Sequence, residues 1–247
     1  MIKFISSLEK CFLDDSYALK RELKKASLFK NEVFRFGACY TTERFLPQTS
    51  KQIVRLKIDS PIEKYIRVWQ VDHVPVKMPC IPGKNDADFL RITPGLYPDL
   101  LTPLRDDKRL MQCNNLESLY FEFAPNGEVE AGEYPVTVML LADGSDTELG
   151  KATIKLNVIN ALLPDTGFKA SQWFYCDCLQ SYYATESFDE KHWSIIESFV
   201  KMAVEHGLNM LLTPVFTPPI DTYVGGERPT TQLIDVTVNN GKYSLGF

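Results

Sequence analysis

Two nearly continuous apolar runs bracket a segment with helical periodicity in the C-terminal third of the chain. The runs cover residues 171–178 and 209–216. Between them, over residues 188–206, apolar side chains recur at intervals of three and four. Short apolar runs are typical of strands that are buried on both faces of a parallel sheet. The pattern therefore predicts a strand, a crossover helix and a parallel strand, which make one βαβ unit.

The first apolar run also contains a carboxylate. Alternation along a strand would place Trp173, Tyr175 and Asp177 on one face and the cysteines at 176 and 178 on the other. Asp177 lies near the carboxyl end of this predicted strand, where α/β folds place their chemistry. The following helix is predicted to begin with a capping box, in which Ser187 precedes Glu190 by three residues.

Residues 32–159 show a different pattern, in which short alternating segments are separated by turn residues. Strands are predicted at 33–40, 52–58, 64–71, 119–123, 135–141 and 151–159. The proline-rich segment 72–115 is predicted to be irregular. In residues 1–31 two assignments stay open, a helix at 17–26 and a strand at 7–12. Strands without a strong helix indicate a β-sandwich.

A linker at 163–167 divides the chain into two predicted domains. The first, residues 1–164, would be the β-sandwich, and the second, residues 165–247, would contain the βαβ unit. Within the second domain, the turn residues Asn239, Asn240 and Gly241 join two short alternating segments. This pattern predicts a β-hairpin at 231–247.

Composition excludes several classes of function. The net charge of −5 lies entirely in residues 165–247, and nucleic-acid binding needs a basic surface. No apolar run approaches the ~18 residues of a membrane span, and the first residues lack the apolar core of a signal peptide. We therefore expect a cytoplasmic location and no membrane contact. The six cysteines and three histidines show no metal-ligand spacing, so structural thiols and no metal or cofactor are expected.

Three stretches of the C-terminal third together resemble the glycoside hydrolase family 123-like proteins, which include a large bacterial group. These stretches are residues 172–179, 188–193 and 212–219, and the likeness is most specific from 172 to 235. Residues 95–101 and 132–134 resemble parts of the N-terminal sandwich of that family.

The resemblance implies a mainly β and α/β fold, with an immunoglobulin-like β-sandwich followed by a TIM-like (β/α) barrel. It also implies β-N-acetylgalactosaminidase-like chemistry. The acetamido group of the substrate acts as the nucleophile, and an adjacent Asp-Glu pair on a later barrel strand orients it and supplies the acid, with retention of configuration. A full barrel takes about 250 residues, so residues 165–247 would form only its first units. The catalytic pair is therefore expected to lie outside this chain, and Asp189-Glu190 is interpreted as a helix start.

Aromatic and polar side chains near the predicted strand ends are the candidates for substrate binding. Tyrosine rings suit stacking on a sugar, and carboxylates and hydroxyls suit its hydroxyl groups. For each candidate a purely structural role stays open, as a core aromatic, a satisfied carboxylate or a loop residue. The candidates are Asp177, Tyr175, Tyr182, Tyr183, Thr217 and Asp221.

Two functions follow from these patterns. The first is the N-terminal part of a glycoside hydrolase that acts on N-acetylhexosaminides, with a carbohydrate substrate but no catalytic residue in this chain. The alternative is a non-catalytic carbohydrate-binding or interaction module. In either case the chain alone is expected to be inactive. Barrel strands without neighbours would expose unpaired edges, which predicts self-association.

Overall fold

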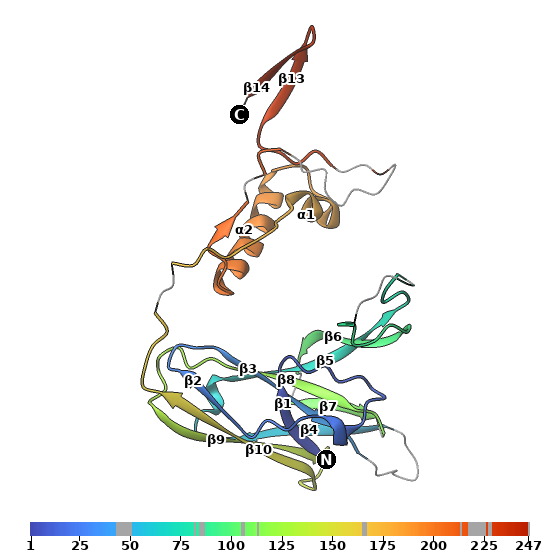
Figure 1. Cartoon of the computed structure of the whole chain (residues 1–247), viewed down its shortest axis with the longest axis vertical. Helices are drawn as coiled ribbons and strands as arrows, with labels where there is room; N and C mark the ends of the chain where they lie inside the picture. The colour runs from blue at the N-terminus through green and yellow to red at the C-terminus, as the bar shows by residue number, and fades with distance from the viewer. Residues whose placement is uncertain are drawn as a thin grey trace. The chain divides into compact units, whose positions relative to one another are not determined.

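The structure is a computed structural model, and it is mainly β-sheet with few helices (Figure 1). It describes residues 1–42, 51–81, 83, 87–104, 107–112, 114–164, 167–212, 214–216, 226 and 229–246. The chain divides into two compact units, an N-terminal unit (Met1–Pro164) and a C-terminal unit (Asp165–Phe247).

The N-terminal unit consists of two five-stranded sheets. The first has the order β1 (Ile2–Ser6), β3 (Phe34–Tyr40), β8 (Glu117–Phe123), β5 (Ile66–Val76) and β6 (Gly95–Pro103), and all its neighbours are antiparallel. The second has the order β2 (Lys25–Phe29), β10 (Glu148–Ile159), β9 (Gly132–Ala142), β4 (Lys51–Asp59) and β7 (Lys108–Gln112). In the second sheet only the β2–β10 pair is parallel.

One hydrophobic core joins the two sheets. Phe36 and Phe121 of the first sheet are stacked with their ring centroids 5.2 Å apart, and Phe4 meets both rings edge-on. Val138 and Leu156 of the second sheet are fully buried in the same cluster. Alternate positions of each strand therefore point into a shared interior, as the alternating sequence pattern requires.

The six predicted strands are present in the N-terminal unit, but the prediction of an irregular segment at 72–115 is wrong. There β5 continues to Val76, and β6 and β7 follow. Pro98 and Pro103 belong to β6, which is the last strand of its sheet. An edge strand tolerates proline because the missing N–H would not be needed by a neighbour on the open side.

The two alternatives for the N-terminal segment are also wrong. The strand lies at Ile2–Ser6 and not at 7–12, and residues 17–26 contain only a 3₁₀ turn at Tyr17–Leu19 (η1) before β2 begins. Residues Lys25–Phe29 pair with the end of β10. Pairing with a neighbouring strand thus overrides the weak helical pattern of this segment.

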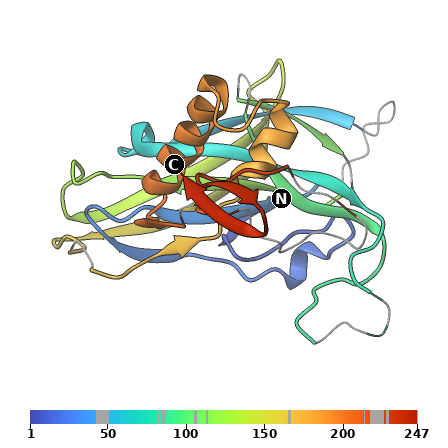
Figure 2. The ribbon, with the colours of Figure 1, turned by 90° about the horizontal axis from the view of Figure 1, so that it is seen from above.

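The distal part of the β5–β6 hairpin extends past its sheet. Residues Ile66 to Gln70 of β5 pair with β8, whereas Trp69 to Val76 pair with β6. Figure 2 shows the far ends of β5 and β6 running out beside the two sheets. Residues Val71 to Val76 therefore pair with β6 alone.

The C-terminal unit contains a short parallel strand pair with two helices between its strands. β11 (Ser171–Gln172) pairs in parallel with β12 (Met210–Leu211), and α1 (Cys176–Tyr183) and α2 (Glu190–Glu205) lie between them in the chain. The predicted parallel arrangement is therefore present. No helix in the described part of the chain is long and apolar enough to cross a membrane.

The predicted extension of the first strand to Cys178 is wrong, because α1 begins at Cys176. Cys176 and Leu179 are buried with Ile196 of α2 in one small apolar cluster. Two residues three positions apart meet one neighbouring helix only when they lie on one helical face. Packing against α2 therefore decides the conformation of a run that alternation alone assigned to a strand.

The predicted capping box of α2 is also wrong, because Asp189 is the N-cap residue. Its Oδ1 accepts a hydrogen bond from the backbone N–H of His192 at 2.6 Å, and its Oδ2 accepts one from Glu186 at 3.3 Å. Ser187 instead donates to Gln180 Oε1 at 3.0 Å. At the other end Gly207 adopts φ 92°, which ends the helix as predicted.

A β-hairpin follows, formed by β13 (Asp235–Asn239) and β14 (Lys242–Gly246). Asn240 and Gly241 both have positive φ at the turn, which fits a type I′ connection. All residues of both strands are exposed, including the apolar Val238 and Leu245. The hairpin thus leaves its own apolar side chains uncovered.

Candidate functional site

The candidate residues of the C-terminal unit gather on α1 and do not lie along a strand. Tyr175 is the N-cap residue of α1, and Asp177 is in its first turn and is 5% exposed. The predicted common strand face of Trp173, Tyr175 and Asp177 is therefore wrong for Asp177, which belongs to the helix, whereas the rings of Trp173 and Tyr175 are in contact. A carboxylate in the first turn of a helix interacts favourably with the helix dipole, so Asp177 suits this position electrostatically.

The tyrosines divide into two groups along α1. Tyr175 meets Trp173 edge-on with their centroids 6.0 Å apart. Tyr182 and Tyr183 meet edge-on at 4.9 Å at the other end of the helix, and Tyr182 is 82% exposed. At 1.5 Å per residue the two groups are separated by about 10 Å along the helix axis. Thr217 and Asp221, the two remaining candidates, lie outside the described residues.

His192 holds the start of α1 against the start of α2, a role that sequence reasoning missed. Its side chain is completely buried, and its Nδ1 accepts the backbone N–H of Phe188 at 2.9 Å. The Nε2 atom therefore carries the proton and donates to the carbonyl of Cys176 at 3.0 Å. The only sequence signal for this contact is the position of His192 in the first turn of a predicted helix. The hydrogen bond to Cys176 places His192 next to the turn that carries Asp177.

Gln180 ties α1 to the segment before the hairpin. Its Oε1 accepts hydrogen bonds from Thr231 Oγ1 at 2.6 Å and from Ser187 Oγ at 3.0 Å. Thr231 is 2% exposed. Polar side chains that were not candidates thus fix α1 from two sides, while Tyr182 and Tyr183 are exposed and Tyr175 is partly buried.

In the described part of the chain, the cysteines form no disulfide bond and belong to no cluster that could hold a metal ion. Cys11, Cys39, Cys80, Cys176 and Cys178 are free. Among the described residues, no three side chains of His, Cys, Asp or Glu are arranged to hold a metal ion. Burial, followed by the nearby charge of Asp177, raises the pKa of Cys176 to about 11. This thiol is therefore protonated and unreactive at neutral pH.

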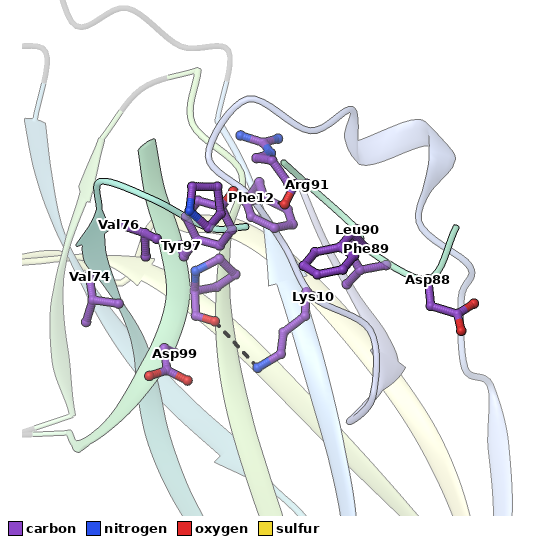
Figure 3. A pocket seen from close by; sticks show the side chains of 12 residues that line it. Lys10, Phe12, Val74, Val76, Asp88, Phe89, Leu90, Arg91, Tyr97 and Asp99 are labelled. Carbon is purple, nitrogen blue, oxygen red and sulfur yellow. Dashed lines mark hydrogen bonds between the residues drawn. The ribbon is translucent and has the colours of Figure 1, made fainter. Parts of the chain in front are cut away.

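A cavity of about 530 Å³ lies in the N-terminal unit, beside the extended β5–β6 hairpin (Figure 3). Its walls come from the segment after β1, from β5, from residues 88–91 and from β6. Phe12 and Tyr97 meet edge-on in it with centroids 5.3 Å apart. This cavity was not predicted, because its walls lie partly in the segment 72–115 that was expected to be irregular.

Hydrogen bonds and one cation–π contact brace the cavity wall. The Arg91 guanidinium lies 3.9 Å from the ring centroid of Phe12 and forms an ion pair with Asp14 at 2.7 Å. The Tyr97 hydroxyl donates to the carbonyl oxygens of Thr93 at 2.7 Å and Arg91 at 3.1 Å. The aromatic rings of the wall are therefore held in place by contacts within the protein.

Comparison with known proteins gives a family match for the C-terminal unit and a similar fold for the chain. Residues 173–247 match the family model of the glycoside hydrolase 123 catalytic domain. A family 123 glycoside hydrolase from Clostridium perfringens, whose structure was solved to study glycolipid glycan hydrolysis, is 14% identical and superposes with a TM-score of 0.74. No curated protein matches the chain.

Two further solved structures superpose only weakly and over part of this chain. The N-terminal domain of PorA is 13% identical with a TM-score of 0.30, and covers 64% of this chain and 97% of its own. The PapD-like domain 7 of human CEP192 is 11% identical with a TM-score of 0.24, and covers 57% of this chain and 84% of its own. Neither carries an argument about this protein.

The superposition with the family 123 structure covers all of this chain but only part of the other one. The superposition includes 100% of this chain but 43% of the Clostridium perfringens chain, so this chain spans less than half of that enzyme. At this identity the superposition shows the fold, and the family model adds the link to the catalytic domain. The resemblance predicted from the sequence is thereby confirmed, since residues 173–247 match the family 123 catalytic-domain model and the chain shares the fold of a family 123 structure.

Proposed function

We propose that this chain is the N-terminal part of a glycoside hydrolase that acts on N-acetylhexosaminides by a substrate-assisted, retaining mechanism. The observation that carries the proposal is the match of residues 173–247 to the family 123 catalytic domain. The similarity in fold over the whole chain supports it. In this proposal residues 1–164 are an immunoglobulin-like sandwich, and residues 165–247 begin a TIM-like barrel.

The catalytic Asp-Glu pair of this proposal lies outside the chain. The adjacent pair that the chain does contain, Asp189-Glu190, begins α2, and both carboxylate oxygens of Asp189 accept backbone N–H groups. A carboxylate occupied in this way is unsuited to hold the acetamido group of a substrate. The pair that orients the acetamido group and supplies the proton therefore belongs to a later barrel strand.

Within this chain, Asp177 is proposed to contact sugar hydroxyls or to hold a catalytic group in position. The adjacent Tyr175 and the exposed Tyr182–Tyr183 pair offer ring faces for stacking on a sugar. The two groups of rings lie about 10 Å apart along α1, which suits successive sugar residues better than a single one. Thr217 and Asp221 remain proposed contacts.

The test uses a gene product that includes the rest of the barrel, with Asp177→Asn as the variant. We expect kcat/KM toward an N-acetylgalactosaminide to fall at least about tenfold, equivalent to ~1.4 kcal/mol of transition-state stabilisation. Because Asp177 is buried, the substitution also costs about 1–3 kcal/mol of stability. Activity is therefore compared per folded molecule.

The matched control is Asp235→Asn, which changes an exposed carboxylate on the hairpin of the same unit. Unchanged kinetics in Asp177→Asn would give Asp177 a structural role only. An equal loss in both variants would show that the effect is not specific to the start of α1.

The alternative function, a carbohydrate-binding module without catalysis, is favoured by a different observation. The braced aromatic cavity of the N-terminal unit lies in a part of the chain that the family 123 catalytic model does not match. Binding there requires no catalytic residue.

A further inference from the structure

Two cysteines of the N-terminal unit lie together in a small buried cluster beside the main core. Cys11, in the segment between β1 and η1, is 1% exposed, and Cys39 of β3 is 0% exposed. Ile5 and Leu116 complete the cluster, and the two thiols are joined by a hydrogen bond. From this geometry we infer that Cys11 and Cys39 form a reversible intramolecular disulfide when the folded chain meets a peroxide.

The backbone around Cys11 allows the small movement that the bond requires. Sulfur atoms within hydrogen-bonding distance need only modest rotations of their side chains to reach an S–S length of about 2.05 Å. Cys11 belongs to no strand, whereas Cys39 is fixed in β3. Single contacts hold the segment, since His73 Nε2 donates to the Cys11 carbonyl at 3.3 Å and Lys20 Nζ donates to the Lys10 carbonyl at 2.7 Å. Cys11 is therefore the partner that adjusts.

The surroundings make Cys39 the thiol that ionises first. The hydrogen bond with Cys11 lowers the pKa of Cys39 despite its burial, and the ammonium groups of Lys3 and Lys20 act in the same direction against Glu9. The same hydrogen bond, followed by burial, raises the pKa of Cys11. Because the thiolate is the nucleophilic form of cysteine, Cys39 is the sulfur that reacts first with an oxidant.

A small oxidant reaches the pair through a cavity of about 310 Å³ that Cys11 lines. Gly37 lines the same cavity, and it lies two positions before Cys39 on β3. Residues two apart on a strand share a face, and a glycine places no side chain on that face beside Cys39. Hydrogen peroxide fits a space of this size, whereas an oxidising protein is too large to enter it.

Hydrogen peroxide supplies the two-electron oxidation. The Cys39 thiolate attacks one peroxide oxygen and the O–O bond breaks. The leaving hydroxide takes up the proton that Cys39 released, which gives water and a sulfenic acid. The Cys11 sulfur then forms the S–S bond and displaces the sulfenic hydroxyl group, which leaves as water with the Cys11 proton. Two thiols and one peroxide thus become one disulfide and two waters, and a dithiol reductant reverses the change.

The disulfide fastens the segment between β1 and η1 to the first sheet. It closes a loop of about 28 residues, from 11 to 39, and a cross-link of this length stabilises a fold by restricting its unfolded state. We expect the melting temperature of the oxidised chain to exceed that of the reduced chain by about 5 °C or more. This consequence does not depend on the proposed hydrolase function.

The test uses the full chain, reduced with dithiothreitol and then freed of the reductant. Hydrogen peroxide is added to the folded chain, the remaining thiols are alkylated with N-ethylmaleimide in urea, and the peptides are mapped without reduction. We expect a peptide pair that joins Cys11 to Cys39, and its loss after dithiothreitol. Cys176 is the internal control, because it is buried and its pKa is raised to about 11. It should be recovered as an alkylated thiol.

Variants separate the two steps of the reaction. In Cys11→Ala, Cys39 should be trapped by dimedone as a sulfenic acid, and peroxide should no longer raise the melting temperature. Cys176→Ala is the matched control and should form the linked peptide as the wild type does. The linked peptide is measured on the wild type itself, so the test stands even where a variant fails to fold.

Three results would overturn the inference. The first is the absence of the linked peptide from the folded wild type after oxidation. The second is a linked peptide that appears only after unfolding in urea, and the third is a melting temperature that oxidation leaves unchanged or lowers. None of these measurements involves hydrolysis of a glycoside, so failure here is distinct from failure of the proposed function.

Discussion

Arg109 connects the two sheets of the N-terminal unit through groups that are largely buried. Its side chain is 10% exposed, and its Nε donates to Glu117 Oε2 at 3.0 Å. Its other nitrogens reach Asp72 Oδ1 at 3.4 Å and the carbonyl of Val71 at 3.3 Å. The Tyr40 hydroxyl donates to the same Glu117 oxygen at 3.0 Å. Charges that are taken out of water are tolerated only with such compensation.

Replacing Arg109 by alanine should therefore be costly. The change removes the Arg109 guanidinium from Glu117, whose side chain is 5% exposed. We expect a loss of about 3–5 kcal/mol in the free energy of unfolding, measured by urea titration. The control Arg55→Ala breaks an exposed pair with Asp146 and should cost less than about 1 kcal/mol. Similar small losses in both variants would contradict the structural role of Arg109.

At the level of the elements, packing explains both what the sequence predicted and what it missed. The strands of the N-terminal unit were predictable because apolar and polar residues alternate along a strand that has one buried face, as in β8 and β10. The run at 171–178 has no such alternation of burial. Its conformation depends on the contact of Cys176 and Leu179 with Ile196, which is distant in the sequence. A local pattern does not contain that information.

In the candidate site, too, the local features were predicted and the long-range contacts were not. Aromatic and acidic residues around 175–183 were found from their types and positions, because those features are local. The pairing of His192 with the carbonyl of Cys176 and of Gln180 with Thr231 depends on how α1 meets its neighbours. The cavity wall at 88–99 was missed because prolines concealed an edge strand.

The helix at 176–183 makes a direct prediction about two cysteines. In a strand, Cys176 and Cys178 would share one face, whereas in α1 they lie on opposite sides. Cys176 is 4% exposed and its pKa is raised to about 11, while Cys178 is exposed. Iodoacetamide at about pH 8 should alkylate Cys178 rapidly and Cys176 only after unfolding. Peptide mass mapping measures both rates, and equal native rates would argue for the strand.

At the level of the whole molecule, the C-terminal unit carries much uncovered apolar surface. Trp173 is 61% exposed, Leu212 is 50% exposed and Phe216 is 53% exposed. β11 and β12 are two residues long and pair with one another, and no further strand is described in their sheet. Exposed patches and strand edges of this kind promote association.

We therefore expect the purified chain to self-associate. Light scattering over a range of concentrations should show a mass that rises with concentration, and the double substitution Leu212→Ser, Phe216→Ser should reduce this rise. The pair Leu8→Ser, Leu19→Ser changes leucines of the N-terminal unit that are even more exposed, and serves as the control. A mass equal to that of the monomer at all concentrations would contradict the expectation.

The measurement closest to the central claim is the release of p-nitrophenol from p-nitrophenyl N-acetyl-β-galactosaminide, with residues 1–247 and the longer gene product assayed side by side. We expect no turnover by residues 1–247, because Asp189 is occupied as a helix cap and the proposed catalytic pair lies on a later strand. We expect turnover by the longer product, and little by that product on the corresponding galactoside, which lacks the acetamido nucleophile. Turnover by residues 1–247 alone, or equal hydrolysis of both glycosides, would contradict the proposed function.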